Sequence, residues 1–241
     1  MNDAFEKFRA TANQAYHLTM TDRQLEQFQA YYELLITWNE KMNLTAITEL
    51  SEVLQKHFLD SLAIASCIDL SSKKQILDVG TGAGFPGIPL KIMFPSCEIV
   101  LLDSLQKRLT FLDEVIERLQ LNGISTVHGR SEDLSHKIEY REQFDLVVSR
   151  AVANLSTLSE FCIPFVKQGG LFVAYKSEKT EEEIMQAKAA IHLLGGKVFR
   201  TEEYSIPETE LYRTLVMIEK VEHTSKKYPR KAGTPLKNPL S

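Results

Sequence analysis

One stretch decides the fold of this chain: Asp78-Val79-Gly80-Thr81-Gly82-Ala83-Gly84-Phe85-Pro86-Gly87. An apolar run, Ile76–Val79, leads into it and a helical pattern follows, so the stretch predicts a glycine-rich turn between a strand and a helix. Glycines let a backbone turn tightly and approach a ligand closely at the carboxyl end of a strand. We therefore expect a nucleotide-like cofactor to bind at this turn.

Short apolar runs alternate with helical patterns from Lys74 onward. Strands are predicted at Ile76–Val79, Glu98–Leu102, Ser125–His128, Phe144–Val148 and Leu171–Tyr175. Helices are predicted at Gln106–Leu121, Ser156–Val166 and Glu181–Leu194. This alternation indicates an α/β fold with a mostly parallel sheet that helices cover on both faces. Two late runs, Lys197–Tyr204 and Tyr212–Val221, predict an antiparallel hairpin at the sheet edge.

The chain before this pattern has helical periodicity. Thr21 and Gln24 form a capping-box pattern at the start of one helix. Its expected apolar face consists of Leu25, Phe28, Tyr32 and Leu35. We therefore expect three parts: an N-terminal helical extension over residues 1–70, the α/β domain over 71–221, and a C-terminal tail over 222–241.

The tail carries the clearest local charge. The whole chain has a formal net charge of -4, which is a mild argument against a large nucleic-acid partner, but local distribution decides binding. From His223 to the end no residue is acidic, and five are basic: Lys226, Lys227, Arg230, Lys231 and Lys237. Because prolines interrupt this segment, we expect an extended basic arm. The alternative is that Tyr228 and the prolines pack the tail back onto the domain.

Composition excludes several classes of protein. The 241 residues are 44% apolar and 25% charged, as in ordinary globular chains. Residues 1–9 do not resemble a signal peptide, and no apolar run is long enough for a membrane span. Cys67, Cys97 and Cys162 have no Cys or His at metal-ligand spacing. We expect a cytoplasmic protein with reduced thiols, no metal site and no membrane partner.

The identity of the cofactor depends on the acidic residues near the glycines. Gly82, Gly84 and Gly87 also satisfy the dinucleotide fingerprint, in which a helix terminus takes a pyrophosphate. S-adenosylmethionine has cationic groups and no phosphate, and Asp78 supplies an anion before the first glycine. Asp103, at the end of the next strand, suits ribose hydroxyls in either cofactor. The pattern favours S-adenosylmethionine; a dinucleotide, a structural turn, and a loop-ordering role for Asp78 remain alternatives.

At this point the chain resembles the rRNA small-subunit methyltransferase G family, also called glucose-inhibited division protein B. The resemblance covers nearly the whole chain. Its motifs are Trp38-Asn39, Asn43-Leu44-Thr45, His57, Asp60-Ser61-Leu62, Asp78–Pro89, Gly129-Arg130-Ser131-Glu132, Ser149-Arg150-Ala151-Val152-Ala153 and Tyr228-Pro229-Arg230-Lys231, with Gly233, Pro235, Lys237 and Pro239-Leu240. One departure is Ser131, where many members have Ala.

The resemblance implies a class I S-adenosylmethionine-dependent methyltransferase with a seven-stranded Rossmann-like sheet. Its implied reaction is N7-methylation of a guanine in the 530 loop of 16S ribosomal RNA, within the small subunit or an assembly intermediate, with no oligomer required. By motif, the cofactor would contact Gly80, Phe85, Ser131, Glu132 and Arg150. The position of Arg150 after the fourth strand agrees with such a role. The alternatives are a surface carboxylate for Glu132 and a strand-end ion pair for Arg150.

Guanine N7 carries a lone pair and no proton, so methyl transfer to it needs no general base and depends on positioning. No catalytic residue is therefore assigned; positioning candidates are Arg150, Lys176 and Arg213. Candidates for RNA phosphates are Lys107, Arg108, Arg130, Lys176, Arg213, Lys226, Lys227, Arg230 and Lys231. For any single one, a solvated cation is an equal alternative. His57 and Trp38 are interpreted as structural.

Two rival functions remain at this stage. A nicotinamide-dependent oxidoreductase would use the same glycine loop, but the sequence shows no catalytic Tyr-Lys or His-acid pair. A ribosome-assembly factor with a vestigial cofactor pocket would bind RNA without catalysis. Retention of Asp78, Asp103 and the glycines speaks against such decay.

Overall fold

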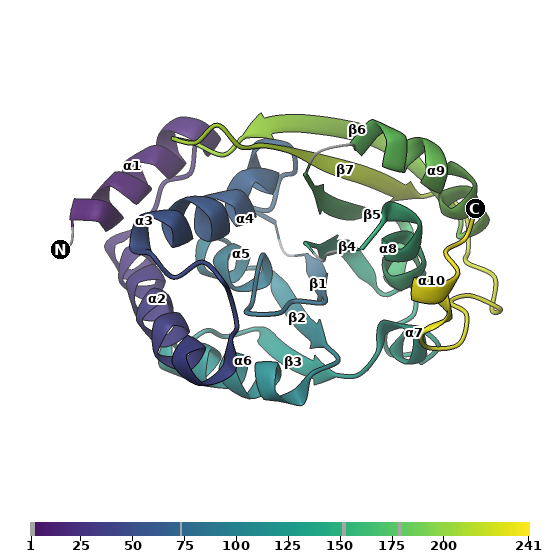
Figure 1. Cartoon of the computed structure of the whole chain (residues 1–241), viewed down its shortest axis with the longest axis horizontal. Coiled ribbons are helices and arrows are strands. Elements are labelled where there is room, and N and C mark those ends of the chain that lie inside the picture. Colours follow the sequence, from purple (N-terminus) through teal and green to yellow (C-terminus); the bar gives the residue numbers. More distant parts are fainter. Residues whose placement is uncertain (1–2, 73, 151–152, 178–179) are drawn as a thin grey trace.

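The protein is described from a computed structural model, which covers residues 3–72, 74–150, 153–177 and 180–241. Its centre is a seven-stranded sheet of order β3-β2-β1-β4-β5-β7-β6 (Figure 1). The strands are β1 (Gln75–Val79), β2 (Glu98–Asp103), β3 (Ile124–His128), β4 (Phe144–Ser149), β5 (Val166–Lys176), β6 (Gly196–Ser205) and β7 (Tyr212–Lys220). The first five run parallel, and β7 pairs antiparallel with both β5 and β6. The predicted fold class is confirmed.

Helices cover both faces of the sheet because successive strand residues point to opposite sides. Ile76 and Val148 belong to the apolar cluster that packs against α5 (Gly87–Met93), α6 (Gln106–Arg118) and the N-terminal helices. Leu77 and Val147 belong to the opposite cluster, with α8 (Leu155–Cys162) and α9 (Thr180–Leu193). Two short helices, α7 (Ser131–Leu134) and α10 (Thr234–Lys237), lie in the C-terminal half of the chain.

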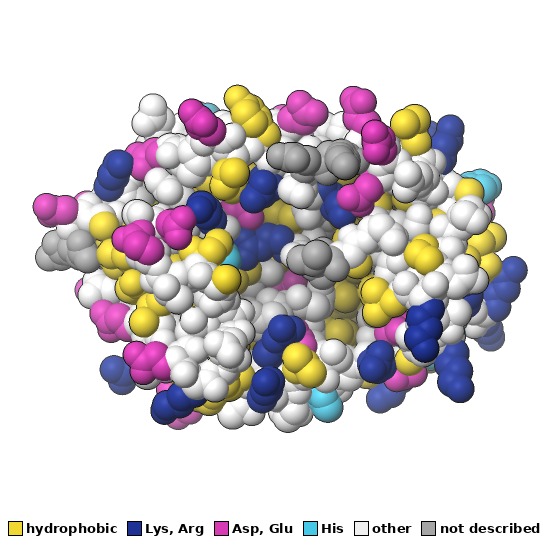
Figure 2. Space-filling view, in the orientation of Figure 1, with side chains coloured by type: hydrophobic (Ala, Val, Ile, Leu, Met, Phe, Trp, Pro, Cys, Tyr) yellow, Lys and Arg dark blue, Asp and Glu magenta, His cyan; other side chains and the backbone are white. Residues whose placement is uncertain are grey.

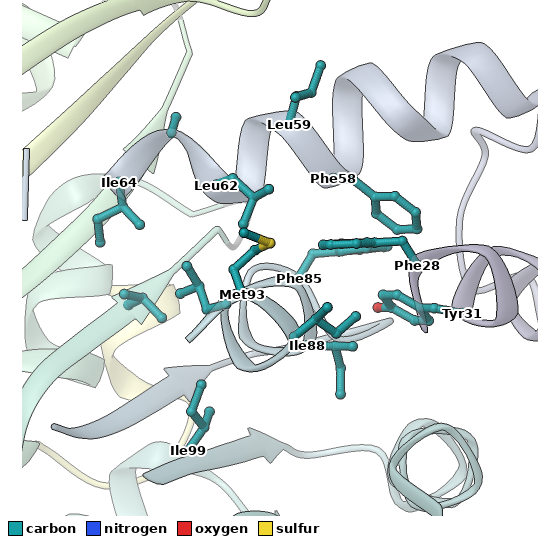
Figure 3. Packing of buried hydrophobic residues seen from close by; sticks show 14 of the residues in the cluster. Phe28, Tyr31, Phe58, Leu59, Leu62, Ile64, Phe85, Ile88, Met93 and Ile99 are labelled. Carbon is teal, nitrogen blue, oxygen red and sulfur yellow. The ribbon is translucent and has the colours of Figure 1, made fainter. Parts of the chain in front are cut away.

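The N-terminal helices share the core of the sheet face that they cover. They are α1 (Asp3–Tyr16), α2 (Asp22–Met42), α3 (Leu50–Val53), a π-helical turn (Leu54–Leu59), α4 (Asp60–Leu62) and a 3-10 turn (Ala63–Ser66). The capping box of Thr21 and Gln24 is confirmed. The buried tyrosine of α2 is Tyr31, not Tyr32 as predicted, because Tyr31 packs against the rings of Phe58 and Phe85 (Figure 3).

One predicted helix is wrong at its end. We expected a helix over Ser156–Val166, but α8 ends at Cys162 and a 3-10 turn follows over Ile163–Phe165. Pro164 has no N–H with which to continue the α-helical pattern. As a result β5 begins at Val166, five residues before its predicted start.

The expected extended arm is also wrong, because the tail packs onto the domain beside α7 and α8 (Figure 1). Arg230 forms an ion pair with Glu160, which is fully buried. Arg141 donates hydrogen bonds to the carbonyls of Thr224, Ser225 and Tyr228. Tyr228 is itself buried. The tail residues therefore form ion pairs and hydrogen bonds with the α/β domain, which the run of cations alone could not indicate.

Candidate active site

A pocket of about 940 Å³ lies at the carboxyl ends of β1, β4 and β5. Open α/β sheets bind their ligands at this edge. Its walls come from the glycine loop, from the segments after β4 and β5, and from the N-terminal region. Its lining residues include Leu44, Thr45, Ile47, Lys56, His57, Asp60, Gly80, Gly82, Phe85, Arg108, Arg150, Lys176, Glu183 and Arg213. Figure 2 shows Lys and Arg side chains gathered around the hollow in the middle of this face.

Gly82 and Gly84 of the glycine loop have different surroundings. Gly82 has a φ of +62°, and a Cβ placed on it would find no atom closer than the Gly80 carbonyl oxygen at 4.0 Å. A Cβ on Gly84 would lie 2.7 Å from the Tyr31 hydroxyl. Tyr31 also donates a hydrogen bond to the Ala83 carbonyl at 2.5 Å. Gly82 thus leaves room for a ligand, whereas Gly84 permits the packing of α2 against the loop.

Asp78 lies beneath the loop and does not line the pocket. Its Oδ2 accepts hydrogen bonds from the Thr81 hydroxyl at 2.7 Å and the Gly87 N–H at 2.9 Å. Burial raises the pKa of Asp78 to about 6, against the opposing effect of these hydrogen bonds. Its Oδ1 is buried without a hydrogen-bond partner among the described residues. The contacts of Asp78 are those of a loop-ordering carboxylate, and a nearby cation would favour its ionised form.

The other predicted acidic contacts are also occupied by protein groups. Asp103 is buried and accepts hydrogen bonds from the backbone N–H groups of Gly82 and Leu105, each at 2.9 Å. Its Oδ2 also lies 3.3 Å from Arg108. Glu132 accepts a hydrogen bond from the Gly233 N–H at 2.8 Å, and the Ser131 hydroxyl donates to it at 3.3 Å. Neither Ser131 nor Glu132 lines the pocket.

Arg150 is the centre of a polar cluster in the pocket wall. Its guanidinium pairs with the buried Asp60 carboxylate at 2.8 Å and donates to the backbone carbonyl of Lys56 at 3.2 Å. It also lies 5.0 Å from the centre of the Phe85 ring, within the range of a cation–π contact. Arg150 therefore forms the strand-end ion pair of the alternative reading and still lines the pocket. Ala151 and Val152 of the same motif lie outside the described residues.

His57 lies in the same wall and is not simply a core side chain. Its ring stacks on Phe85 with the ring centres 4.5 Å apart. Burial, followed by the charge of Arg150, lowers the pKa of His57 to about 3, so the ring is neutral at physiological pH. Trp38, by contrast, packs into the core with its ring centre 5.8 Å from that of Phe111. The structural interpretation of Trp38 agrees with these contacts.

The cations of the pocket differ in their partners. Lys56 pairs with Glu52, and Lys176 pairs with Glu183 at 2.7 Å. Arg108 pairs with Asp103, and Arg150 pairs with Asp60. Within the described part of the chain, Arg213 has no carboxylate partner and donates only to the Tyr212 carbonyl, at 3.0 Å. Of the five pocket cations, Arg213 is therefore the one that forms no ion pair among the described residues.

The remaining predicted RNA contacts lie outside the pocket. Lys107, Arg130, Lys226, Lys227 and Lys231 are exposed, and Arg230 is held by Glu160. Among the pocket residues to which sequence reasoning assigned no role are Thr45, Asp60 and Glu183. Thr45 and Asp60 belong to the family motifs of the sequence, and this membership could have indicated a role for them. Glu183 belongs to no such motif.

Among the described residues, no three His, Cys, Asp or Glu side chains cluster closely enough to hold a metal ion. In the same residues, no helix combines the length and apolar character that crossing a bilayer requires.

Comparison with known proteins identifies the family. The family model described as "GidB: rRNA small subunit methyltransferase G" matches residues 24–212. A protein named ribosomal RNA small subunit methyltransferase G from Lachnoclostridium phytofermentans is 53% identical over 92% of each chain. One of the same name from Staphylococcus aureus strain Newman is 51% identical, over 93% of this chain and 94% of its own. 

Solved structures are similar at the level of the fold. M. jannaschii TYW2 in complex with AdoMet has a TM-score of 0.51 and 18% identity, over 63% of this chain and 71% of its own. TrmN from Thermus thermophilus has a TM-score of 0.51 and 14% identity, over 70% of this chain and 53% of its own.

The fold and the pocket define a class I S-adenosylmethionine-dependent methyltransferase. The chain belongs to the GidB family of small-subunit rRNA methyltransferases, and S-adenosylmethionine is its cofactor. Neither the oxidoreductase nor the assembly-factor alternative has support in these comparisons. The residues present fit the cofactor, because the space above Gly82 is open and, among the described residues, Oδ1 of the buried Asp78 beneath the loop has no hydrogen-bond partner.

Proposed function

We propose that this chain transfers the methyl group of S-adenosylmethionine to N7 of a guanine in the 530 loop of 16S ribosomal RNA. The proposal rests on one observation above others: the pocket at the strand ends combines an open glycine loop with a cation, Arg213, that has no carboxylate partner among the described residues. The relatives' names give ribosomal RNA of the small subunit as the substrate class. We propose that the protein binds its target guanine in the cytoplasm, on the small subunit or on an assembly intermediate.

In this proposal the chain holds the cofactor with four residues of the pocket wall: Gly80, Gly82, Phe85 and Arg150. Asp78 and Asp103 act from beneath by fixing the loop, and contacts from Ser131 and Glu132 would require these side chains to leave their present partners. The cofactor supplies an electrophilic methyl group. The protein supplies orientation, because N7 of guanine attacks with a lone pair and loses no proton.

The same chemistry explains the composition of the pocket. His57 is neutral and hydrogen-bonded on both ring nitrogens, so it is not available as a base, and the reaction needs none. Lys176 and Arg150 are held by carboxylates and serve as positioning groups. Of the predicted cations, Arg213 is the best placed to donate hydrogen bonds to an RNA phosphate.

Mapping of modified nucleosides tests this function directly. We expect 16S RNA from cells without the protein to lack one N7-methylguanosine in the 530 loop, and a plasmid copy of the gene to restore it. A copy with Gly82→Leu should fail to restore it. An unchanged set of 16S modifications in cells without the protein would overturn the proposal.

A further inference from the structure

The Thr45 hydroxyl occupies a defined place in the pocket wall. The Thr45 backbone N–H donates to the Asn39 side-chain oxygen at 2.8 Å, which fixes the loop after α2. Its Oγ1 accepts a hydrogen bond from the Ile47 N–H at 3.0 Å. The same oxygen lies 2.9 Å from Nε2 of His57. What the hydroxyl can still do depends on which ring nitrogen of His57 carries the proton.

The neighbours of His57 decide that position. Nη2 of Arg150 lies 3.3 Å from Nδ1 of His57, and a guanidinium can only donate. The Arg150 contact therefore assigns Nδ1 as the acceptor. Since burial and the Arg150 charge keep the ring neutral, its one proton is on Nε2. Nε2–H then donates to Thr45 Oγ1.

Both lone pairs of Thr45 Oγ1 are now filled, one by Ile47 N–H and one by His57 Nε2–H. Its proton has no acceptor among the described residues. Thr45 is half-buried and lines the pocket between two apolar side chains, Leu44 and Ile47. The pocket therefore contains an uncharged hydroxyl that can donate a hydrogen bond and cannot accept another, beside apolar surface suited to a planar base.

We propose that Thr45 donates this hydrogen bond to O6 of the target guanine and thereby selects guanine over adenine. The inference rests on the proposed function, because an enzyme that methylates N7 must approach the edge where O6 is the neighbouring atom. Guanine presents two acceptors there, N7 and O6, whereas adenine presents N7 and a donating amino group. The amino group of adenine would face the Thr45 hydroxyl, and because both groups are donors no hydrogen bond could form between them. Arg150 and His57 act as positioning residues that hold Thr45 in this state.

The test compares three forms of the enzyme on two target bases. Small subunits are reconstituted with 16S RNA that carries either guanine or 2,6-diaminopurine at the target position; the analogue keeps N7 and replaces O6 by an amino group. Wild type, Thr45→Val and Thr45→Ser are compared by kcat/KM for methyl transfer. Calorimetric binding of S-adenosylhomocysteine reports separately on the cofactor site and on folding.

We expect wild type to prefer guanine by roughly 10- to 100-fold, the range for leaving a buried polar group unpaired. Thr45→Val should lose most of this factor on guanine and little on the analogue, so that the preference collapses. Thr45→Ser should behave like wild type, and the affinity for S-adenosylhomocysteine should be equal in all three. If Thr45→Val fails to fold, Thr45→Ala is carried through the same comparison.

One result would overturn the inference alone: a preference for guanine that Thr45→Val leaves unchanged, whether the variant keeps its activity or loses it equally on both bases. Absence of N7 methylation by wild type on guanine-containing subunits would instead overturn the proposed function, and the inference with it. The two failures are distinguishable because the second is seen before any variant is made.

Discussion

The Arg150 guanidinium lies 2.8 Å from the Asp60 carboxylate and joins the end of β4 to the start of α4. The Tyr204 hydroxyl donates to the other oxygen of Asp60 at 2.7 Å, so β6 is tied to the same point. Burial, followed by the negative charge of Asp60, raises the pKa of Tyr204, which stays a donor at all physiological pH values. Three segments far apart in the sequence thus converge on one carboxylate, and this contact fixes the pocket wall formed by Arg150.

Replacement of Asp60 by Ala should destabilise the protein by about 3 kcal/mol, because it leaves a largely buried guanidinium without its partner. Urea unfolding measures the change. Glu52→Ala is the matched control: it removes the carboxylate of Lys56, a more exposed cation of the same wall, and should cost less than about 1 kcal/mol. Equal effects of the two substitutions would show that the Arg150 contact is no more important than a surface pair.

Stability should depend on pH through His57. Its folded-state pKa, about 3, is below the value near 6.5 of an unfolded histidine, so below about pH 6.5 the unfolded chain binds a proton that the folded chain does not. Folding is therefore weakened as pH falls, by about 2 kcal/mol between pH 7.5 and 5. Urea unfolding at both pH values should show that His57→Gln loses this part of the dependence. Other titrating groups, including Asp78, cancel in the comparison with wild type.

Two glycines of one loop should respond differently to substitution. Gly82→Leu places a side chain in open pocket space and should abolish binding of S-adenosylmethionine, while the strain of a positive φ costs only about 1 to 2 kcal/mol. Gly84→Ala should mainly destabilise the fold, because its Cβ would clash with Tyr31, Ile88 and Leu112. Calorimetry and thermal unfolding of both variants separate the effects. Intact cofactor binding by a folded Gly82→Leu protein would remove the loop from the site.

Local pattern was sufficient for the sheet. The strand at Ile76–Val79, the glycine turn and the late antiparallel hairpin follow from periodicity and turn residues, which are local properties of the chain. Pro164 is a local signal too, and the prediction of a helix through it ignored the missing N–H. The exact face of α2 depended on which tyrosine the aromatic cluster accommodates, which is decided by packing with Phe58 and Phe85.

Of the site residues, the sequence predicted those that directly follow a strand. Gly82 and Arg150 follow strands, so topology places them at the pocket. The partners of Arg150 do not follow strands: Asp60 comes from a helix 90 residues earlier in the chain. Likewise, no pattern within residues 222–241 indicates that Glu160 is buried and forms an ion pair with Arg230. Long-range ion pairs of this kind are fixed by tertiary packing. A sequence motif can single out one residue of such a pair, but it does not show which residue is the partner.

The packed tail changes which of its cations can serve RNA. Arg230 uses its guanidinium on Glu160, a carboxylate with no exposed surface, and on the Asn238 carbonyl. Lys226, Lys227 and Lys231 remain exposed on the segment that Arg230 anchors. Arg230 and the three lysines should therefore have separable roles, the first in stability and the others in RNA affinity.

Arg230→Ala should lower the free energy of unfolding by about 3 kcal/mol, because Glu160 would be left buried and unpaired. Joint replacement of Lys226, Lys227 and Lys231 by Gln should leave stability within about 0.5 kcal/mol of wild type. If these lysines meet phosphates, the triple variant should lose up to three counterion contacts, and the slope of log affinity against log salt should become shallower by roughly 2. Affinity for S-adenosylmethionine should be unchanged.

Filter binding of 16S RNA across a salt series measures this slope, with calorimetry for the cofactor. The control is Lys188→Gln with Lys197→Gln, two exposed lysines outside the pocket and the tail, compared per charge removed. The same loss of slope per charge in this control would mean that the tail acts only through net charge. An unchanged slope in the triple variant would mean that the three lysines are solvated and the segment is purely structural, since each phosphate contact must release a counterion when it forms.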